Sequence, residues 1–388
     1  MICALGATAS ECSEALFANI LPQMSQRETA DGTVVPVFEA PVIPALPEHF
    51  SVYECRNNRL AFACYQQVES AVRAHAERIS PDRLGVVLGS STSGLDASEF
   101  AFEVLRQTGY RPDTYNFDTQ HAMGSLSQFV TELAGAKGPA YTVSTACSSA
   151  AKAMLSAKGL IDAGICDAVI TGGVDSLCAL TVNGFGALGQ LSTERMNPLS
   201  KNRSGLNIGE GGALFLLTRD SAGVQLLGGG ESMDAYHMSA PQPEGVGAEL
   251  AMKRALDDAA VCAADVMYVN LHGTATRAND AMETQAVKRL LPETMVSSSK
   301  PLFGHCLGAA GAIEAAICCI SLADTQGRLP AHHFDGSYDT QLPVLPLASV
   351  KSRYRDGTIR RVVMSNSFAF GGNNCALVLG ESEKGERE

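Results

Sequence analysis

The apolar and polar positions along the chain alternate between short strand-like runs and longer stretches with helical spacing. Apolar runs of strand length lie at residues 84–89, 140–143, 167–173, 213–217, 266–271 and 362–365. Helical spacing of apolar and small residues recurs at residues 11–20, 57–79 and 248–260. Strands that alternate with helices in this way predict an α/β fold.

Two predicted helices, at residues 148–164 and 307–322, differ from the others because they carry almost no charge. A helix that is apolar on all sides is buried on all sides, so each of these should lie in a middle layer. The two halves of the chain are alike in this outline. We therefore expect a duplicated α-β-α-β-α five-layer architecture with halves at residues 1–220 and 221–388, and with the two central helices between two sheets.

The composition indicates a globular protein and argues against several other classes. The chain has 388 residues, 46% hydrophobic and 18% charged, which suffices for one large core or two fused cores. Its twelve cysteines include no paired CxxC motif, so we expect no metal site and no disulfide framework, as is typical of the reducing cytoplasm. We expect no secretory leader and no membrane span. The net charge of −12 argues against general nucleic-acid binding, but it is compatible with a local basic patch that docks an acidic partner.

Cys147 stands at a predicted strand-to-helix elbow, between the strand at 140–143 and the helix at 148–164. Unpaired backbone N–H groups and the positive end of the helix dipole favour the thiolate at such a position, which makes Cys147 a candidate nucleophile. The alternative is a buried structural cysteine, the commoner role for a cysteine in apolar surroundings. Bases from elsewhere in the chain would decide between the two.

Two other predicted strand ends supply such groups. His272 follows the strand at 266–271, and Lys300 and His305 share a later glycine-containing loop. Sites in α/β sheets form beyond the carboxyl ends of strands, so these residues can converge with Cys147. One histidine beside a cysteine suggests hydrolysis or acyl transfer. Two histidines and a lysine fit a further step, in which a malonyl thioester loses CO2 and neutral N–H donors stabilise the enolate.

Each residue alone also has a plainer interpretation. A histidine before Gly-Thr is usually a turn or core residue, and a lone lysine is usually a solvated surface charge. Their shared placement in glycine-flanked loops after strands argues against this for the set.

Four motifs in this order resemble the β-ketoacyl-ACP synthases of the elongating type. They are residues 145–149 (TACSS), 272–276 (HGTAT), 300–311 (KPLFGHCLGAAG) and 366–372 (NSFAFGG). The resemblance implies the thiolase fold and a homodimer, or a heterodimer with a related ketosynthase-like subunit. It also implies ping-pong decarboxylative condensation with malonyl units on the phosphopantetheine arm of an acyl carrier protein, in fatty-acid or polyene and polyketide elongation.

The resemblance assigns roles to the candidate residues. Cys147 takes the acyl chain, and His272 and His305 activate the malonyl thioester and stabilise the enolate. Lys300 supports His305 electrostatically, with Glu314 as its partner.

Further roles follow from the same resemblance. Thr274 and Thr276 hydrogen-bond the phosphopantetheine arm, and Phe368 lies in the substrate site. Phe370 is the gating aromatic, and its backbone N–H forms an oxyanion hole with that of Cys147. The remaining implied positions are Ser365 and Asn366, which buttress this loop and help to bind a structural monovalent cation, and the carrier-docking residues Arg56, Arg59, Lys201 and Arg203.

The chain departs from the family pattern at three places. The strand and Thr-Gly-x-Gly turn that usually precede the region of residues 5–7 are missing, so we expect the numbered start to be internal to the natural chain. Ala369 replaces a usual glycine in the gating loop, and its Cβ should reduce the freedom of that loop. Ser204 replaces a usual aspartate. These features suggest a specialised branch such as the synthases of aryl-polyene-type pathways.

Two rival functions remain at this point. A thiolase shares the fold and uses a second cysteine, for which Cys375 lies in the right region but in the wrong glycine context. A non-catalytic chain-length partner of a ketosynthase typically lacks the nucleophile, whereas Cys147 is present here.

Overall fold

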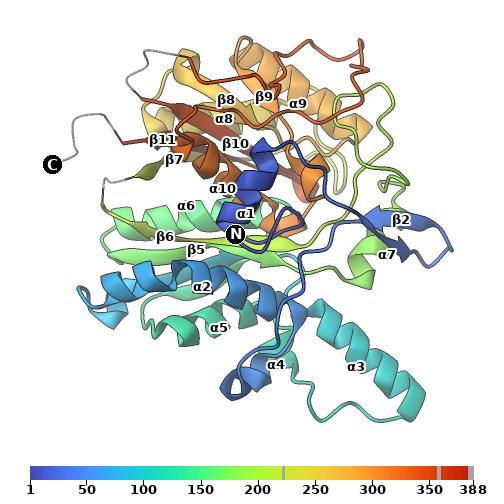
Figure 1. Cartoon of the computed structure of the whole chain (residues 1–388), viewed down its shortest axis with the longest axis vertical. Coiled ribbons are helices and arrows are strands. Elements are labelled where there is room, and N and C mark those ends of the chain that lie inside the picture. The colour runs from blue at the N-terminus through green and yellow to red at the C-terminus, as the bar shows by residue number, and fades with distance from the viewer. Residues whose placement is uncertain (221–222, 356–359, 383–388) are drawn as a thin grey trace.

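The computed structural model describes residues 1–220, 223–355 and 360–382. Its layers alternate between helices and sheets, as Figure 1 shows from the outer helices α2 and α5 at the bottom to α8 and α9 at the top. The predicted five-layer α/β architecture is confirmed. Hydrophobic clusters fill the spaces between successive layers.

The first sheet contains the strands of the N-terminal half in the order β4-β3-β5-β6. Strands β4 and β5 run parallel to β3, whereas β6 runs antiparallel to β5. Ile2 forms an isolated antiparallel bridge with Gly212 of β6. The strands are β3 (Leu84–Gly89), β4 (Ala140–Val143), β5 (Ala168–Asp175) and β6 (Gly211–Thr218), and the outer helices are α2 (Arg56–Ala76) and α5 (Ser125–Ala134).

The second sheet repeats this arrangement with one more strand, in the order β7-β11-β10-β8-β9. Strands β8, β9 and β10 are parallel, and β11 is antiparallel to both β10 and β7. The strands are β7 (Val224–Met233), β8 (Val266–Asn270), β9 (Met295–Ser297), β10 (Val362–Ala369) and β11 (Asn373–Glu381), and the outer helices are α8 (Val246–Ala259) and α9 (Arg277–Leu290).

Helices α6 (Ser149–Asp162) and α10 (Ala310–Ala323) form the middle layer and pack against each other and against both sheets. Small residues allow this close approach. A Cβ on Gly311 of α10 would lie 3.0 Å from the Cβ of Ala151 on α6, and one on Gly89 of β3 would lie 2.3 Å from the backbone nitrogen of Ala150. The lack of charge on these helices is therefore a consequence of burial between two sheets.

The remaining elements lie around the layers, and α3 and α4 project from the lower part of the molecule (Figure 1). The glycine-rich residues 184–191 are partly helical, because α7 extends through residue 187. These elements are α1 (Ala9–Phe17), β1 (Ser25–Glu28), β2 (Val34–Val37), α3 (Leu95–Thr108), α4 (Phe117–Gln120) and α7 (Ala179–Ala187). Short 3-10 turns are η1 (Glu48–Tyr53), η2 (Pro81–Arg83), η3 (Ala263–Asp265), η4 (Lys300–Leu302), η5 (Leu307–Ala309) and η6 (Phe370–Gly372).

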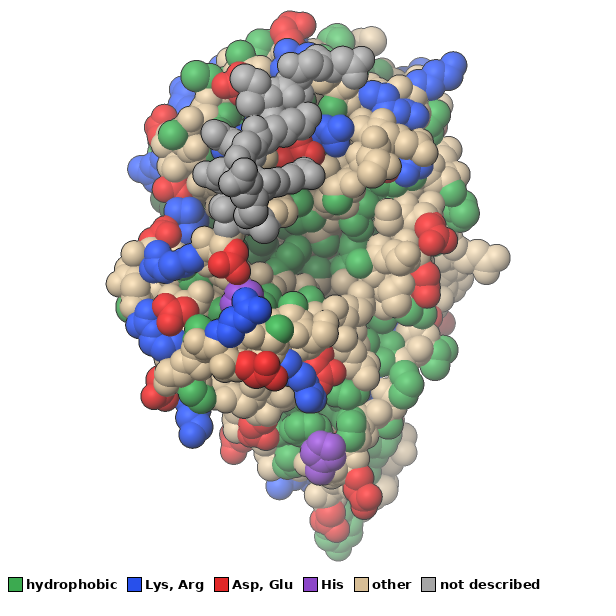
Figure 2. Space-filling model, turned by 60° about the vertical axis from the view of Figure 1, so that its left-hand side comes forward, with side chains coloured by type: hydrophobic (Ala, Val, Ile, Leu, Met, Phe, Trp, Pro, Cys, Tyr) green, Lys and Arg blue, Asp and Glu red, His purple; other side chains and the backbone are tan. Residues whose placement is uncertain are grey.

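Figure 2 shows one face of the molecule, where hydrophobic side chains gather in a hollow and charged side chains of both signs are interspersed around it. Among the described residues on this face, the positive charges form no continuous surface. No helix in the described ranges has both the length and the hydropathy needed to cross a bilayer.

Candidate active site

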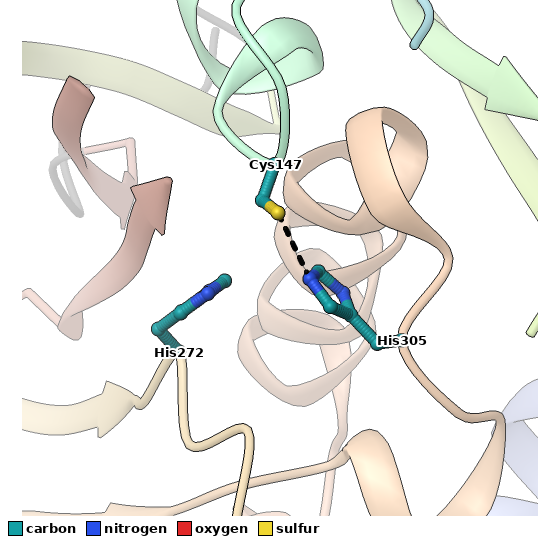
Figure 3. A group of neighbouring side chains, drawn as sticks. All are labelled: Cys147, His272 and His305. Carbon is teal, nitrogen blue, oxygen red and sulfur yellow. Dashed lines mark hydrogen bonds between the residues drawn. The ribbon is translucent and has the colours of Figure 1, made fainter. Parts of the chain in front are cut away.

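The structure brings together Cys147, His272 and His305 from three separate loops, as the strand-end argument predicted. Cys147 precedes α6, His272 follows β8, and His305 lies between η4 and η5. Ligand-type atoms of the three side chains all lie within 4.8 Å of one another. Figure 3 shows both imidazole rings turned toward the sulfur. All three side chains are buried, so they form an enclosed reaction centre.

The elbow that presents Cys147 has a strained backbone. Ala146 adopts φ +52°, a left-handed conformation that side-chain-bearing residues rarely take. Ser149 stabilises it, because its hydroxyl donates to the Ala146 carbonyl at 2.6 Å and accepts from the Thr145 N–H at 2.9 Å. The turn aims the thiol away from the sheet and toward the histidines.

Burial raises the pKa of the Cys147 thiol to about 11. Lys300 and the backbone N–H groups of Phe370 and Cys147 oppose this shift but do not overcome it. The backbone N–H groups therefore favour the thiolate, as expected of the helix N-terminus, but desolvation by burial has the larger effect on the pKa. The thiol needs a base, and His305 Nε2 lies 3.0 Å from the sulfur (Figure 3).

His272 is held as a neutral hydrogen-bond donor. The Lys300 ammonium lies 3.4 Å from His272 Nδ1 and has no lone pair, so Nδ1 accepts and the ring proton lies on Nε2. Burial, followed by the charge of Lys300, keeps the pKa of His272 well below its usual value. The same two causes lower the pKa of His305. The two rings are nearly perpendicular, with centroids 5.3 Å apart.

Lys300 and Glu314 form an ion pair that is completely buried. Burial raises the pKa of Glu314 to about 7, against the attraction of Lys300. The sequence argument expected Lys300 to support His305. Its charge lowers the pKa of both histidines, but of the two rings it is His272 to which the Lys300 ammonium hydrogen-bonds.

A buried carboxylate that the sequence argument missed holds the His272 loop. Glu283 on α9 accepts hydrogen bonds from the backbone N–H groups of His272 and Gly273, both at 2.8 Å. Asn366 donates to Glu283 at 3.2 Å, so it supports this loop indirectly. Burial raises the pKa of Glu283 to about 7. The sequence signal that could have indicated Glu283 is an acidic residue in the second turn of the helix that directly follows the HGTAT loop.

A cavity of about 50 Å³ lies over the reacting atoms. Thr274, Thr276, Phe368 and Phe370, all expected at the substrate site, line it together with the three reacting side chains. Phe370 packs against Phe185 of α7 with ring centroids 5.4 Å apart.

The basic residues expected at the carrier surface differ in their surroundings. Arg203 is wrong for this role, because its buried guanidinium donates to Asp339 at 2.6 Å and lies beside Asp280. Arg56 is paired with the buried Glu210, and Arg59 with Glu54. Lys201 is exposed, and no described carboxylate forms an ion pair with it.

Comparison with known proteins agrees with this geometry. Family models described as "Beta-ketoacyl synthase, N-terminal domain" and "Beta-ketoacyl synthase, C-terminal domain" match residues 56–222 and 225–334. A 3-oxoacyl-[acyl-carrier-protein] synthase 2 of Staphylococcus aureus is 34% identical over 320 residues, which cover 78% of this chain and 76% of that protein.

Solved structures show the same fold over nearly the whole chain. A chain of the complex between a ketosynthase (ApeO) and its chain length factor (ApeC) from Xenorhabdus doucetiae has a TM-score of 0.91 and 39% identity, over 98% of this chain and 95% of that one. A β-ketoacyl synthase from Burkholderia phymatum STM815 has a TM-score of 0.86 and 27% identity, over 98% and 97%. With its Cys147, His272 and His305 constellation on a thiolase-type fold, the chain belongs to the β-ketoacyl synthase family of acyltransferases.

Proposed function

We propose that this chain is the condensing subunit that extends a carrier-bound acyl chain by decarboxylative Claisen condensation with malonyl-ACP. One observation carries the proposal: a buried thiol faces two imidazoles whose neutral form is enforced by burial and by Lys300. Hydrolysis needs one base beside the nucleophile, whereas two neutral donors suit a developing enolate oxygen.

In the first half-reaction, the Cys147 thiol attacks the carbonyl of an acyl thioester. The new S–C bond forms while the thiol proton passes to His305 Nε2, and the backbone N–H groups of Cys147 and Phe370 stabilise the oxyanion. The bond to the phosphopantetheine sulfur then breaks, and that sulfur takes the proton. Cys147 is left as a thioester, and the free carrier departs.

In the second half-reaction, the malonyl thioester carbonyl accepts a hydrogen bond from Nε2–H of His272. It accepts a second one from His305 after the ring proton of His305 has moved from Nδ1 to Nε2. The bond to its carboxylate breaks, releasing CO2 and leaving an enolate whose charge these donors stabilise. The enolate carbon attacks the Cys147 thioester, the S–C bond breaks, and a 3-oxoacyl thioester two carbons longer leaves on the carrier. The Cys147 thiolate takes up one proton.

The partners belong to the same proposal. The similarity to a ketosynthase in complex with its chain length factor supports a heterodimer with a related subunit, with a homodimer as the alternative. Similarity at 39% identity also supports a specialised polyene or polyketide pathway of the aryl-polyene type. A division of the chain near residue 220 and a cytoplasmic location stay predictions.

For the acidic carrier, Lys201 is the one of the four expected basic residues that combines exposure with the absence of a described ion-pair partner. Arg277 is also exposed and lies between Thr276 and Ala278, which both line the cavity. Since the chain carries a net charge of −12, local cations near the entrance would favour the encounter.

The implied monovalent cation has candidate ligands on both sides of β10. Asn366 faces α8 and α9, where it contacts Met252 and Glu283, so the neighbouring Ser365 faces α10. Ser365 Oγ, Glu314 Oε2 and Asn366 Oδ1 are all buried without a hydrogen-bond partner among the described atoms. Such oxygens suit a hard cation. Ser365 and Glu314 are the ligands on the α10 side, and Asn366 is the alternative on the other side.

The test is a product assay with an acyl carrier and a malonyl carrier, with and without a co-expressed related subunit. The proposal predicts a 3-oxoacyl product two carbons longer, absent with Cys147→Ala and with His272→Ala. Absence of product with the wild-type protein under both conditions would overturn it, and would favour the alternative of a non-catalytic chain-length subunit.

A further inference from the structure

Asp175, at the end of β5, is completely buried. It does not belong to the groups that touch substrate, and its carboxylate is surrounded by hydrogen-bond donors. Within the described residues, the donors are hydroxyls and backbone N–H groups and include no lysine or arginine. They are Ser90 Oγ at 2.6 Å, Ser91 N at 2.8 Å, Ser91 Oγ at 2.7 Å, Thr92 N and Oγ1 both at 2.9 Å, and Ala309 N at 3.2 Å. An ionised carboxylate offers about four lone-pair directions, so these contacts fill its acceptor capacity.

The donors come from both halves of the chain. The loop at residues 90–92 follows β3 of the first sheet, whereas Ala309 belongs to η5, four residues after His305. Ser91 adds a second link, because its hydroxyl accepts from the Gly308 N–H at 3.1 Å while donating to Asp175. A Cβ on Gly308 would lie 2.8 Å from Asp175 Oδ2, so this contact requires glycine.

The same loop also touches the nucleophile side of the site. The Ser90 N–H donates to the carbonyl of Val143 at 3.2 Å, at the end of the strand that leads to Cys147. Asp175 therefore sits between the Cys147 elbow and the turn that carries His305. The backbone of His305 is bonded to Asn207 and Gly209, at 2.8 and 3.1 Å, on one side of this turn. Asp175 holds the other side, where Leu307 adopts a left-handed φ of +47° and the side-chain Nδ1 of His305 has no partner within the described residues.

We propose that Asp175 is a positioning residue, which clamps the His305 turn of one half against the Cys147 elbow of the other and so sets the sulfur-to-imidazole distance. The inference rests on the proposed condensation for its kinetic readout. Substitution Asp175→Asn keeps the shape but places an NH2 group against N–H donors, which leaves at least one of them unpaired. A shift of about 1 Å at a reacting centre costs on the order of 10²-fold in rate.

The experiment measures kcat and KM for condensation, and the pH profile of Cys147 alkylation by iodoacetamide, for the full chain with its partner subunit. For Asp175→Asn we expect kcat to fall about 10- to 100-fold with KM within about twofold. The alkylation midpoint should move to lower pH, because one of the charges facing the thiol is lost while Lys300 remains. Asp113→Asn, which removes an exposed carboxylate, is the matched control and should change neither readout.

A folded Asp175→Asn protein with wild-type kcat and an unshifted alkylation profile would overturn the inference. If that variant does not fold, Ser91→Ala decides, since it keeps the Asp175 carboxylate and removes the hydroxyl that links it to Gly308. We expect its kcat to fall about 3- to 10-fold and Ser91→Thr to restore it, whereas an unchanged kcat for Ser91→Ala would contradict the clamp. Failure of the proposed function is distinguishable, because the wild type would then give no product while the alkylation profiles remain measurable.

Discussion

Replacement of Lys300 by methionine removes the charge that, together with the larger effect of burial, keeps the histidines neutral. The Lys300 Nζ lies 3.4 Å from His272 Nδ1. At an effective dielectric constant of about 20, a unit positive charge at this distance disfavours an imidazolium by about 5 kcal/mol before Glu314 opposes it. Lys300→Met also removes the donor that fixes the proton on Nε2. We expect decarboxylation of the malonyl thioester to fall by roughly 10²-fold, as when one preorganised donor is lost.

The assay measures the two half-reactions separately. CO2 release from malonyl-ACP reports decarboxylation, and mass spectrometry of the protein reports acyl transfer to Cys147. Acyl transfer should change by less than about tenfold, because Lys300 contacts His272 and acts on the Cys147 thiol only through its charge.

A control separates the electrostatic effect from instability. Lys300→Met leaves Glu314 buried without a partner, which costs about 3–5 kcal/mol of unfolding free energy. Adding Glu314→Gln should recover much of this stability, yet decarboxylation should stay low. Recovery of decarboxylation in the stable double variant, or near wild-type decarboxylation in the single one, would refute the reasoning.

Four other changes test separate parts of the account. Glu283→Gln leaves one backbone N–H of the His272 loop without a full acceptor, so decarboxylation should fall about 5- to 100-fold in the same CO2 assay. An unchanged rate would show that Glu283 does not support the His272 loop. Ala369→Gly should loosen the gating loop, seen as faster acylation and a broader range of accepted chain lengths, while destabilising the fold by about 0.5–1 kcal/mol in denaturant unfolding. Burial depresses the pKa of His332 to about 4. The unfolding free energy that neutral His332 contributes is therefore present above pH 6.5 and falls by about 3 kcal/mol as the pH drops toward 4. His332→Gln should flatten the plot of unfolding free energy against pH over this range. Lys201→Glu should raise KM for carrier-bound donors but not for acyl-pantetheine, and equal effects on both would exclude docking.

The parts of the site that follow strand ends could be predicted from the sequence. Strand β4 lies at the predicted residues, and Cys147 and His272 directly follow strand-end positions that a parallel sheet gathers at one edge. Helix α7 was missed because Gly184 and Gly186 lower the helix propensity of a segment that tertiary contacts hold helical.

The parts that depend on distant burial could not be predicted. Glu283 and Arg203 look like solvated charges in sequence, yet both are buried, and Arg203 is held by a residue 136 positions away. The net pKa of Cys147 also depends on distant burial. Its local helix N-terminus favours the thiolate, but the surrounding layers raise its pKa, and only the folded arrangement reveals which effect is larger.

The most direct test of the central claim is the intact mass of the protein, with peptide mapping, after incubation with acyl carriers of several chain lengths and with the partner subunit present. The account predicts one acyl group per chain, located on Cys147 and absent from Cys147→Ala. An adduct that persists in Cys147→Ala, or no adduct with any chain length, would contradict it.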